Sequence, residues 1–434
     1  MRKIWILCFV ILSGFVMFSS CKKDEIIDDD NNNQATDAKT EWTKPLALPI
    51  NPALGKNYMP AVDGNDNIYV LMRNFEGDGY GYAMQKFDKN GNELWVKQST
   101  EAGYTPHNQM PTYFQDKLFF TTDKKVVALN SSDGSIAWEY NIPDSMLFIT
   151  QAIAIVENFV LITLENNTAE YSYLFSLNAG TGSVAGTLAV TSDRVWLNMA
   201  ARDNTLYLVH GFLYQVTVNS NGSMNLNWSV QLPGNDPTYY YNFDNDIVIA
   251  PNGNVTFAYG EQSNPSMLKL ISYNNNGNKL WEYERQYSSR ITLDGQGNVY
   301  DGGKDDLIKI DGSSGQKVWS VEPPSEFEYV AMGSFTSMIH ANDGNIYCGD
   351  TYGIYGVNSS GELKYSVYSS TLEIGESVPF SDVTLLSNGN IIVLTMGDGA
   401  NGSIHCIKGS TKGISTIGWP KRGANAANTF NASL

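Results

Sequence analysis

The sequence contains 434 residues, 17% of them charged, and its formal net charge is −17 at pH 7. A chain this acidic is repelled by nucleic-acid phosphates, so nucleic acid is excluded as an expected partner. The 39 glycines, the 12% of aromatic residues and the lack of long helical periodicity favour an all-β chain rich in turns.

A signal peptide is expected at residues 1–20. A short basic start precedes an apolar run over residues 4–18, which is shorter than the roughly 20 residues that a membrane-spanning helix needs. The run leads to Cys21, and its surroundings resemble the lipobox of bacterial lipoproteins, in which this Cys becomes the acylated first residue. Phe18 and Ser20 depart from the Leu and the Gly or Ala that are usual there. We therefore expect lipidation at Cys21, with an ordinary secretory signal as the alternative.

Residues 21–40 are polar and rich in acidic side chains. Such a segment buries too little apolar surface to order itself, so a disordered acidic tether is expected. It resembles a surface-export signal of certain Gram-negative lipoproteins, and a solvated spacer is the alternative. Loss of residues 1–20 removes two positive charges and moves the net charge from −17 to −19. The two segments predict an outer-membrane lipoprotein on either the periplasmic or the surface-exposed side.

One pattern recurs along the rest of the chain: an apolar strand, Asn or Asp, a short turn ending in Gly, and a Trp four residues later. Clear copies span residues 87–95, 129–138, 273–281 and 310–319, and weaker ones lie at residues 177–182, 218–228, 357–365 and 407–419. The Asn or Asp caps the turn, and the Gly adopts the positive φ that a tight hairpin needs. The Trp then lies on the buried face of the next strand and is expected to pack neighbouring sheets together. These blade-packing residues are Trp95, Trp138, Trp281 and Trp319.

A second hairpin precedes each copy and gives four strands per unit. Eight such hairpins lie near Asp63, Asp116, Asn158, Asp203, Asn252, Asp294, Asp343 and Asn388. Their spacing of about 40–50 residues is that of propeller blades, which bury their faces only in a closed ring. The pattern predicts one eight-bladed β-propeller of four-stranded blades over residues 41–434, with seven blades as the alternative. Either residues 41–49 or residues 417–420 could supply the closing strand.

The repeat resembles the pyrroloquinoline-quinone-like (PQQ-like) family over about residues 41–430, and residues 419–429 resemble a Trp-Pro motif of its secreted members. The resemblance implies one of two branches. Quinoprotein dehydrogenases carry PQQ and calcium beneath a pair of adjacent Cys, and this sequence has no such pair. The other branch includes the non-catalytic propeller lipoprotein of the outer-membrane β-barrel assembly machinery. We expect a non-catalytic binding or scaffolding lipoprotein without cofactor; a PQQ-dependent or polysaccharide-acting enzyme is the alternative.

Two Cys remain in the propeller, Cys348 and Cys406, and they are expected to be buried free thiols. The four His are scattered along the sequence, so no metal site is expected.

Function on a propeller concentrates in its long loops, and these are rich in tyrosine, which suits a glycan or an extended peptide. The predicted ligand-binding residues are Tyr80, Tyr82, Tyr239, Tyr240, Tyr241 and Tyr329. Alternatively, these rings pack the loops onto the rim. The expected partner is a protein or a glycan at the cell envelope, the membrane is contacted through the lipid anchor alone, and the chain is expected to be monomeric.

Overall fold

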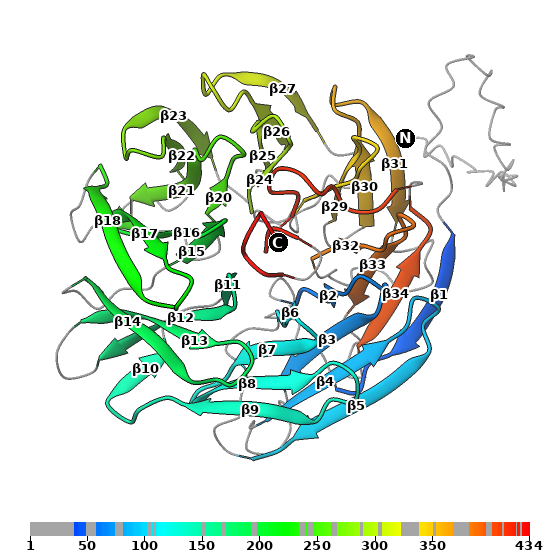
Figure 1. Ribbon diagram of the computed structural model, residues 1–434. Coiled ribbons are helices and arrows are strands. Elements are labelled where there is room, and N and C mark those ends of the chain that lie inside the picture. Colours follow the sequence, from blue (N-terminus) through cyan, green and yellow to red (C-terminus); the bar gives the residue numbers. More distant parts are fainter. Residues whose placement is uncertain are drawn as a thin grey trace, which may run out of the picture. The chain divides into compact units, whose positions relative to one another are not determined.

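The computed structural model gives the structure of the chain (Figure 1). It describes residues 39–48, 58–73, 81–101, 106, 110–148, 153–166, 171–191, 198–233, 239–240, 247–261, 267–286, 290–302, 306–322, 338–349, 353–368, 382–395, 402–409, 412–421, 423–425 and 428–434. These residues belong to one compact unit, Ala35–Leu434. The expected signal peptide, Cys21 and nearly all of the tether lie outside the described residues. In the described part of the chain, no helix is long and apolar enough to cross a membrane.

Every named element is a strand, and the strands form eight antiparallel sheets, or blades, arranged in a ring. Blades 1 to 4 contain β2 (Ala61–Val62), β3 (Ile68–Arg73), β4 (Tyr82–Phe87), β5 (Glu93–Ser99); β6 (Thr112–Phe114), β7 (Lys117–Thr121), β8 (Lys125–Asn130), β9 (Ile136–Asn141); β10 (Met146–Phe148), β11 (Ala154–Val156), β12 (Phe159–Asn166), β13 (Ser172–Asn178), β14 (Val184–Thr191); and β15 (Asn198–Arg202), β16 (Thr205–His210), β17 (Phe212–Val218), β18 (Met224–Gln231).

Blades 5 to 8 contain β19 (Tyr239–Tyr240), β20 (Val248–Ile249), β21 (Val255–Glu261), β22 (Met267–Tyr273), β23 (Lys279–Gln286); β24 (Thr292–Leu293), β25 (Val299–Gly302), β26 (Leu307–Ile310), β27 (Lys317–Val321); β28 (Ile339–His340), β29 (Ile346–Gly349), β30 (Gly353–Val357), β31 (Leu363–Tyr368); and β32 (Thr384–Leu385), β33 (Ile391–Thr395), β34 (Ser403–Ile407), with β1 (Thr40–Pro45). In blades 3 and 5 the innermost strand consists of two pieces, β10 with β11 and β19 with β20. The predicted eight-bladed all-β propeller is confirmed.

The amino-terminal strand closes the ring. β1 pairs antiparallel with β34 and becomes the outermost strand of blade 8. Its Trp42 then reaches blade 1, where the indole Nε1 donates to the Lys89 carbonyl at 3.0 Å. A strand from one end of the chain therefore joins the last blade to the first, as Figure 1 shows for the blue and red segments.

The outermost strands carry a repeated contact between neighbouring blades. In six blades a Trp indole donates to a turn carbonyl of the next blade at 2.9–3.2 Å, and the donors are Trp42, Trp95, Trp138, Trp228, Trp281 and Trp319. In blade 7 the Tyr365 hydroxyl takes this place and donates to the Lys408 carbonyl at 2.8 Å. The turn Gly lies directly beneath the ring, which explains why Gly and Trp recur together in the sequence.

The Gly residue of this contact can be tested at Gly315. Its φ is +72°, and a Cβ there would lie 2.7 Å from Trp281. We expect Gly315→Ala to lower the free energy of unfolding by about 2–4 kcal/mol, because it combines a left-handed alanine with overpacking. Gly344 is the matched control, since its φ is +84° and nothing lies within 4 Å of its added Cβ. Urea titration measures both variants, and Gly344→Ala should lower the free energy of unfolding by about 1 kcal/mol. Equal losses in the two variants would show that the contact between Gly315 and the Trp281 ring does not stabilise the fold.

Candidate functional site

The described residues of the carboxy-terminal segment, 412–421, 423–425 and 428–434, cross the centre of the ring instead of closing it (Figure 1). Its backbone bonds to innermost strands: Trp419 exchanges two hydrogen bonds with Leu293 of blade 6, and the Pro420 carbonyl accepts from the His340 amide of blade 7. The Phe430 carbonyl accepts from the Ala201 amide of blade 4. This segment therefore caps the central axis and joins blades that are far apart in the sequence.

Asn428 extends the cap to blades 1 and 2. Its amide donates to the carbonyls of Met59, Pro60 and Pro111 at 3.1–3.3 Å. Its side-chain oxygen accepts from the Lys421 ammonium at 2.7 Å. Both side chains are fully buried, so this amide satisfies main-chain groups and a cation that water does not reach.

We expect Asn428→Ala to lower the free energy of unfolding by about 2–4 kcal/mol. The change leaves three buried carbonyls and an ammonium without this partner, and it places alanine at a φ of +57°. Amide hydrogen exchange measures the local consequence: Ala201 and Leu293, whose amides bond the cap, should lose protection. Asn425→Ala is a comparison on the same segment, where the side chain bonds within the cap; a larger loss there would contradict this role for Asn428.

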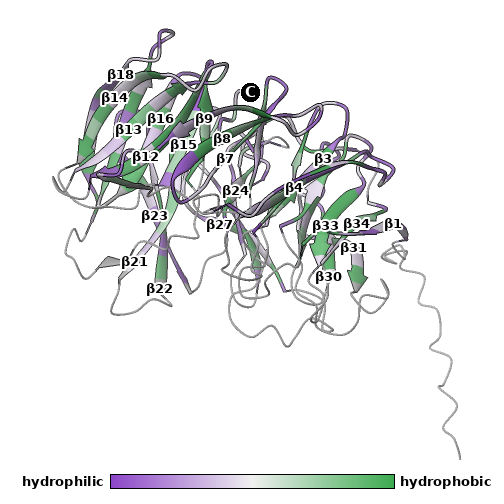
Figure 2. Cartoon of the chain, turned by 90° about the horizontal axis from the view of Figure 1, so that it is seen from below, coloured by the Kyte–Doolittle hydropathy of each residue, from purple (hydrophilic) through white to green (hydrophobic). Residues whose placement is uncertain are grey.

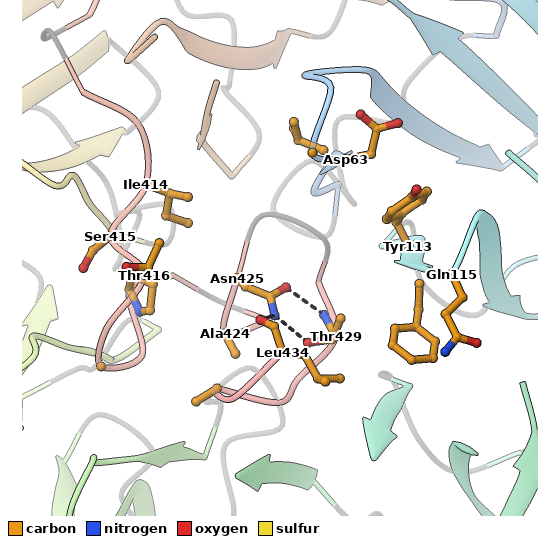
Figure 3. Close-up of a pocket in the computed structure, with 16 residues that line it drawn as sticks. Asp63, Tyr113, Gln115, Ile414, Ser415, Thr416, Ala424, Asn425, Thr429 and Leu434 are labelled. Atoms are coloured by element: carbon orange, nitrogen blue, oxygen red, sulfur yellow. Dashed lines mark hydrogen bonds between the residues drawn. The ribbon is translucent and has the colours of Figure 1, made fainter. Parts of the chain in front are cut away.

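A pocket of about 500 Å³ lies between this cap and the first hairpins of blades 1 and 2 (Figure 3). This volume is within the range of roughly 300–1,000 Å³ that ligand sites occupy. The hairpin turns at Asp63 and Gln115 line it, so the pocket lies at the face that carries the tight turns. The carboxy-terminus lies at the same face (Figure 2). Phe114, Ile414 and Leu434 add apolar lining.

Asp63 is the acidic side chain among the described lining residues, and hydrogen bonds from its own hairpin already occupy its carboxylate. Asp63 accepts from the amides of Asn65 and Asn67, from the Asn67 side chain and from the Tyr69 hydroxyl at 2.8–2.9 Å. Burial, and then the hydrogen bond to Asp116, raise the pKa of Tyr113 to about 12, so this phenol is neutral at physiological pH. The pocket therefore suits an uncharged group, such as a side chain or a sugar.

An ion pair lies toward the other end of the axis. The Arg290 guanidinium donates from Nη1 to both carboxylate oxygens of Asp382 at 2.6 Å, and both residues are buried. Arg290 precedes the innermost strand of blade 6 and Asp382 that of blade 8. The pair thus joins blades 6 and 8, which are separated in the ring by blade 7.

Two buried histidines belong to the packing of the blades. His405 bonds Thr43 of the closing strand at 2.9 Å and Thr395 of β33 at 2.7 Å. His340 bonds Thr292 of blade 6 at 2.8 Å. Burial lowers the pKa of each imidazole to about 4. They lie in different blades, and no group of three or more possible metal-ligating side chains occurs among the described residues. Cys348 and Cys406 are buried free thiols, as predicted.

The predicted ligand-binding tyrosines are not brought together in the described structure. Tyr80, Tyr241 and Tyr329 lie outside the described residues. The backbone of Tyr239 and Tyr240 forms β19, paired with the end of β21 that is distant from its hairpin turn. Tyr82 is 1% exposed and packs edge-to-face on Phe120 at 4.8 Å, so its ring contributes to the core between blades 1 and 2.

The sequence did not single out the central pocket. Residues 417–420 are one of the two candidates for the closing outer strand, whereas Trp419 pairs with the innermost strand of blade 6.

The closed ring and the repeated Gly–Trp contacts define the class of protein, an eight-bladed β-propeller of PQQ-like repeats. The sequence family described as outer membrane protein assembly factor BamB matches residues 32–228 and 268–430, which is most of the chain. The chain belongs to this family. No curated protein sequence matches it.

Three solved structures share the fold at low sequence identity. BamB from Moraxella catarrhalis is 12% identical, with a TM-score of 0.58 over 85% of this chain and 99% of that one. Quinohemoprotein alcohol dehydrogenase from Comamonas testosteroni is 11% identical, with a TM-score of 0.60 over 87% and 78%. The C-terminal WD40 domain of Sif2 is 10% identical, with a TM-score of 0.56 over 87% and 100%. Because one neighbour is an enzyme and another is an assembly factor, these likenesses show the fold alone.

Proposed function

We propose that this chain is a non-catalytic, BamB-like scaffold anchored by a lipid at Cys21 to the bacterial outer membrane. The family match carries the proposal. The cap supports it, because residues 412–434 fill the axis at the tight-turn face and leave the faces and outer edges of the ring for partners. The partner is a protein or a glycan, bound by the monomer through the tyrosine-rich long-loop face.

The described residues do not fit a quinone cofactor with calcium. Asp382 already engages the buried Arg290 through both carboxylate oxygens. The described part of the chain also lacks a cluster of acidic ligands for a divalent ion, and the sequence has no adjacent Cys pair. These features favour scaffolding over the dehydrogenase chemistry of the enzyme neighbour.

Reconstitution with PQQ and Ca²⁺ tests the class of function. We expect no quinone absorbance after gel filtration and no dye-linked alcohol oxidation. A stoichiometric quinone spectrum with turnover would overturn the proposal.

The binding face is tested by changing Tyr239, Tyr240 and Tyr241 to Ala together in the full-length chain. A glycan array and cross-linking in whole cells would report the partner. Binding should fall at least ten-fold, whereas unchanged binding would remove the long-loop face from the proposal.

A further inference from the structure

Charge is distributed unevenly over the outermost strands of the eight blades. Six of these strands carry at least one Lys, Arg, Asp or Glu, and they are β1, β5, β9, β23, β27 and β31. The other two, β14 and β18, carry none. They lie within residues 171–192 and 204–235, which contain no acidic or basic side chain apart from His210, in a chain that is 17% charged. Blades 3 and 4 therefore share an uncharged outer wall.

Equivalent positions show what this wall lacks. Thr187 of β14 pairs with Phe175. At the equivalent position of the outer strand, blade 2 has Glu139, paired with Val127, and blade 5 has Glu282, paired with Ile271. Ala189 likewise occupies the position of Glu284. Both Thr187 and Ala189 are exposed, so burial does not explain why these two positions carry no charge.

The strand β14 also lacks the large ring that stands on other outer strands. Gly186 occupies the position of Trp95 and Trp281. A Cβ on Gly186 would lie 2.4 Å from the Gly222 carbonyl oxygen of blade 4, and the Ser176 hydroxyl donates to that oxygen at 2.6 Å. The backbones of blades 3 and 4 thus approach closely at Gly186 and Gly222. A partner chain that paired with β14 would meet small side chains there.

An exposed outer strand presents unpaired main-chain groups, and soluble proteins usually protect such edges with charge. In the described structure β14 ends its sheet and pairs with β13 alone. Its eight residues have no charge and no proline, and Val184 is 46% exposed. Beside it, Leu226 of β18 is 42% exposed. Depletion of charge is typical of the core of a protein interface.

We propose that the outer edge of β14 pairs with an extended, uncharged segment of a partner protein, which it adds to blade 3 as a further strand. This inference rests on the proposed scaffolding function and names its partner as a protein. Main-chain hydrogen bonds supply the affinity in such strand addition. A neutral segment matches the edge because the acidic chain repels carboxylates and β14 offers no counter-charge to a basic segment. Two copies of a chain with net charge −17 repel each other, which disfavours a second copy as the occupant.

The probe is a fluorescent, end-capped octapeptide of alternating threonine and valine, titrated by anisotropy against the full-length lipidated chain in nanodiscs. The variant Thr187→Glu with Ala189→Glu places the acidic residues of blades 2 and 5 on β14. The control Val96→Glu with Gln98→Glu makes the same change at the same register of β5. We expect at least ten-fold weaker binding for the β14 variant and unchanged binding for the control. A peptide N-methylated at every second residue, which cannot pair as a strand, should not bind.

Several results would overturn the assignment: no binding by the parent chain, equal binding by the β14 variant, or binding of the N-methylated peptide. A dimer in sedimentation that the β14 variant abolishes would assign the edge to a second copy. Thermal unfolding of each variant verifies folding. Failure here is separable from failure of the proposed function, since recovery of the chain with its outer-membrane partner despite the β14 changes would leave the scaffold role intact.

Discussion

Between pH 6.5 and pH 4, the free energy of unfolding should fall by about 5 kcal/mol, because His340 and His405 are buried as neutral imidazoles. Their pKa in the folded chain is about 4, whereas an unfolded histidine titrates near 6.5. In this interval the unfolded chain binds more protons, so acid favours unfolding. Each group contributes about 3 kcal/mol, fully present above pH 6.5 and lost as the pH falls toward 4. For His340, the charge of Asp294 opposes the effect of burial and that of Lys309 reinforces it.

Urea unfolding followed by tryptophan fluorescence at pH 7, 5.5 and 4 measures this dependence. His405→Gln should remove about half of it. Carboxyl groups such as Asp311, whose pKa is held at about 2 by hydrogen bonds from Ser313 and Ser314, lose their contribution below about pH 4, outside the interval. A stability that stays constant from pH 7 to 4 would contradict the buried neutral state of both histidines.

Asp382→Ala should lower the free energy of unfolding by about 3–5 kcal/mol. Asp382 is 0% exposed and Arg290 is 5% exposed, so the variant leaves a guanidinium buried without its carboxylate. The combined change Arg290→Met with Asp382→Leu should recover most of the loss, since replacing a buried pair by apolar groups is often neutral. Denaturant titration of Arg290→Met, of Asp382→Leu and of their combination gives the coupling energy. Additive losses would show that the two residues do not act as a pair.

The sequence predicted the ring well because its repeat has a direct physical cause. The Gly at each turn packs beneath the Trp of the preceding blade, as Gly315 does beneath Trp281. The Trp four residues after that Gly packs on the turn Gly of the next blade, as Trp319 does on Gly361. Contacts of this kind recur in six blades, so the repeat of Gly and Trp can be recognised from the sequence alone. The hairpins also predict blades 3 and 7, although Gly186 takes the place of the Trp in blade 3 and Tyr365 in blade 7.

Closure and the central pocket could not be predicted, because they depend on contacts between remote parts of the chain. Trp42 and Trp419 both suit a strand, yet Trp42 pairs with blade 8 while Trp419 pairs with Leu293 at the axis. Which end of the chain closes the ring depends on the register with β34, and local patterning does not encode that register. Tyr82 shows the same difficulty: a tyrosine beside a glycine-rich loop has the pattern of an exposed residue, but its position at the start of β4 places it in the core.

Purification of the cross-linked, full-length chain from the outer membrane of its own cells tests the scaffold function most directly. Mass spectrometry should identify outer-membrane assembly proteins in stoichiometric amounts, cross-linked to residues of the propeller, and the purified complex should show no quinone absorbance. Recovery of the chain without a protein partner but with a bound redox cofactor would contradict the account.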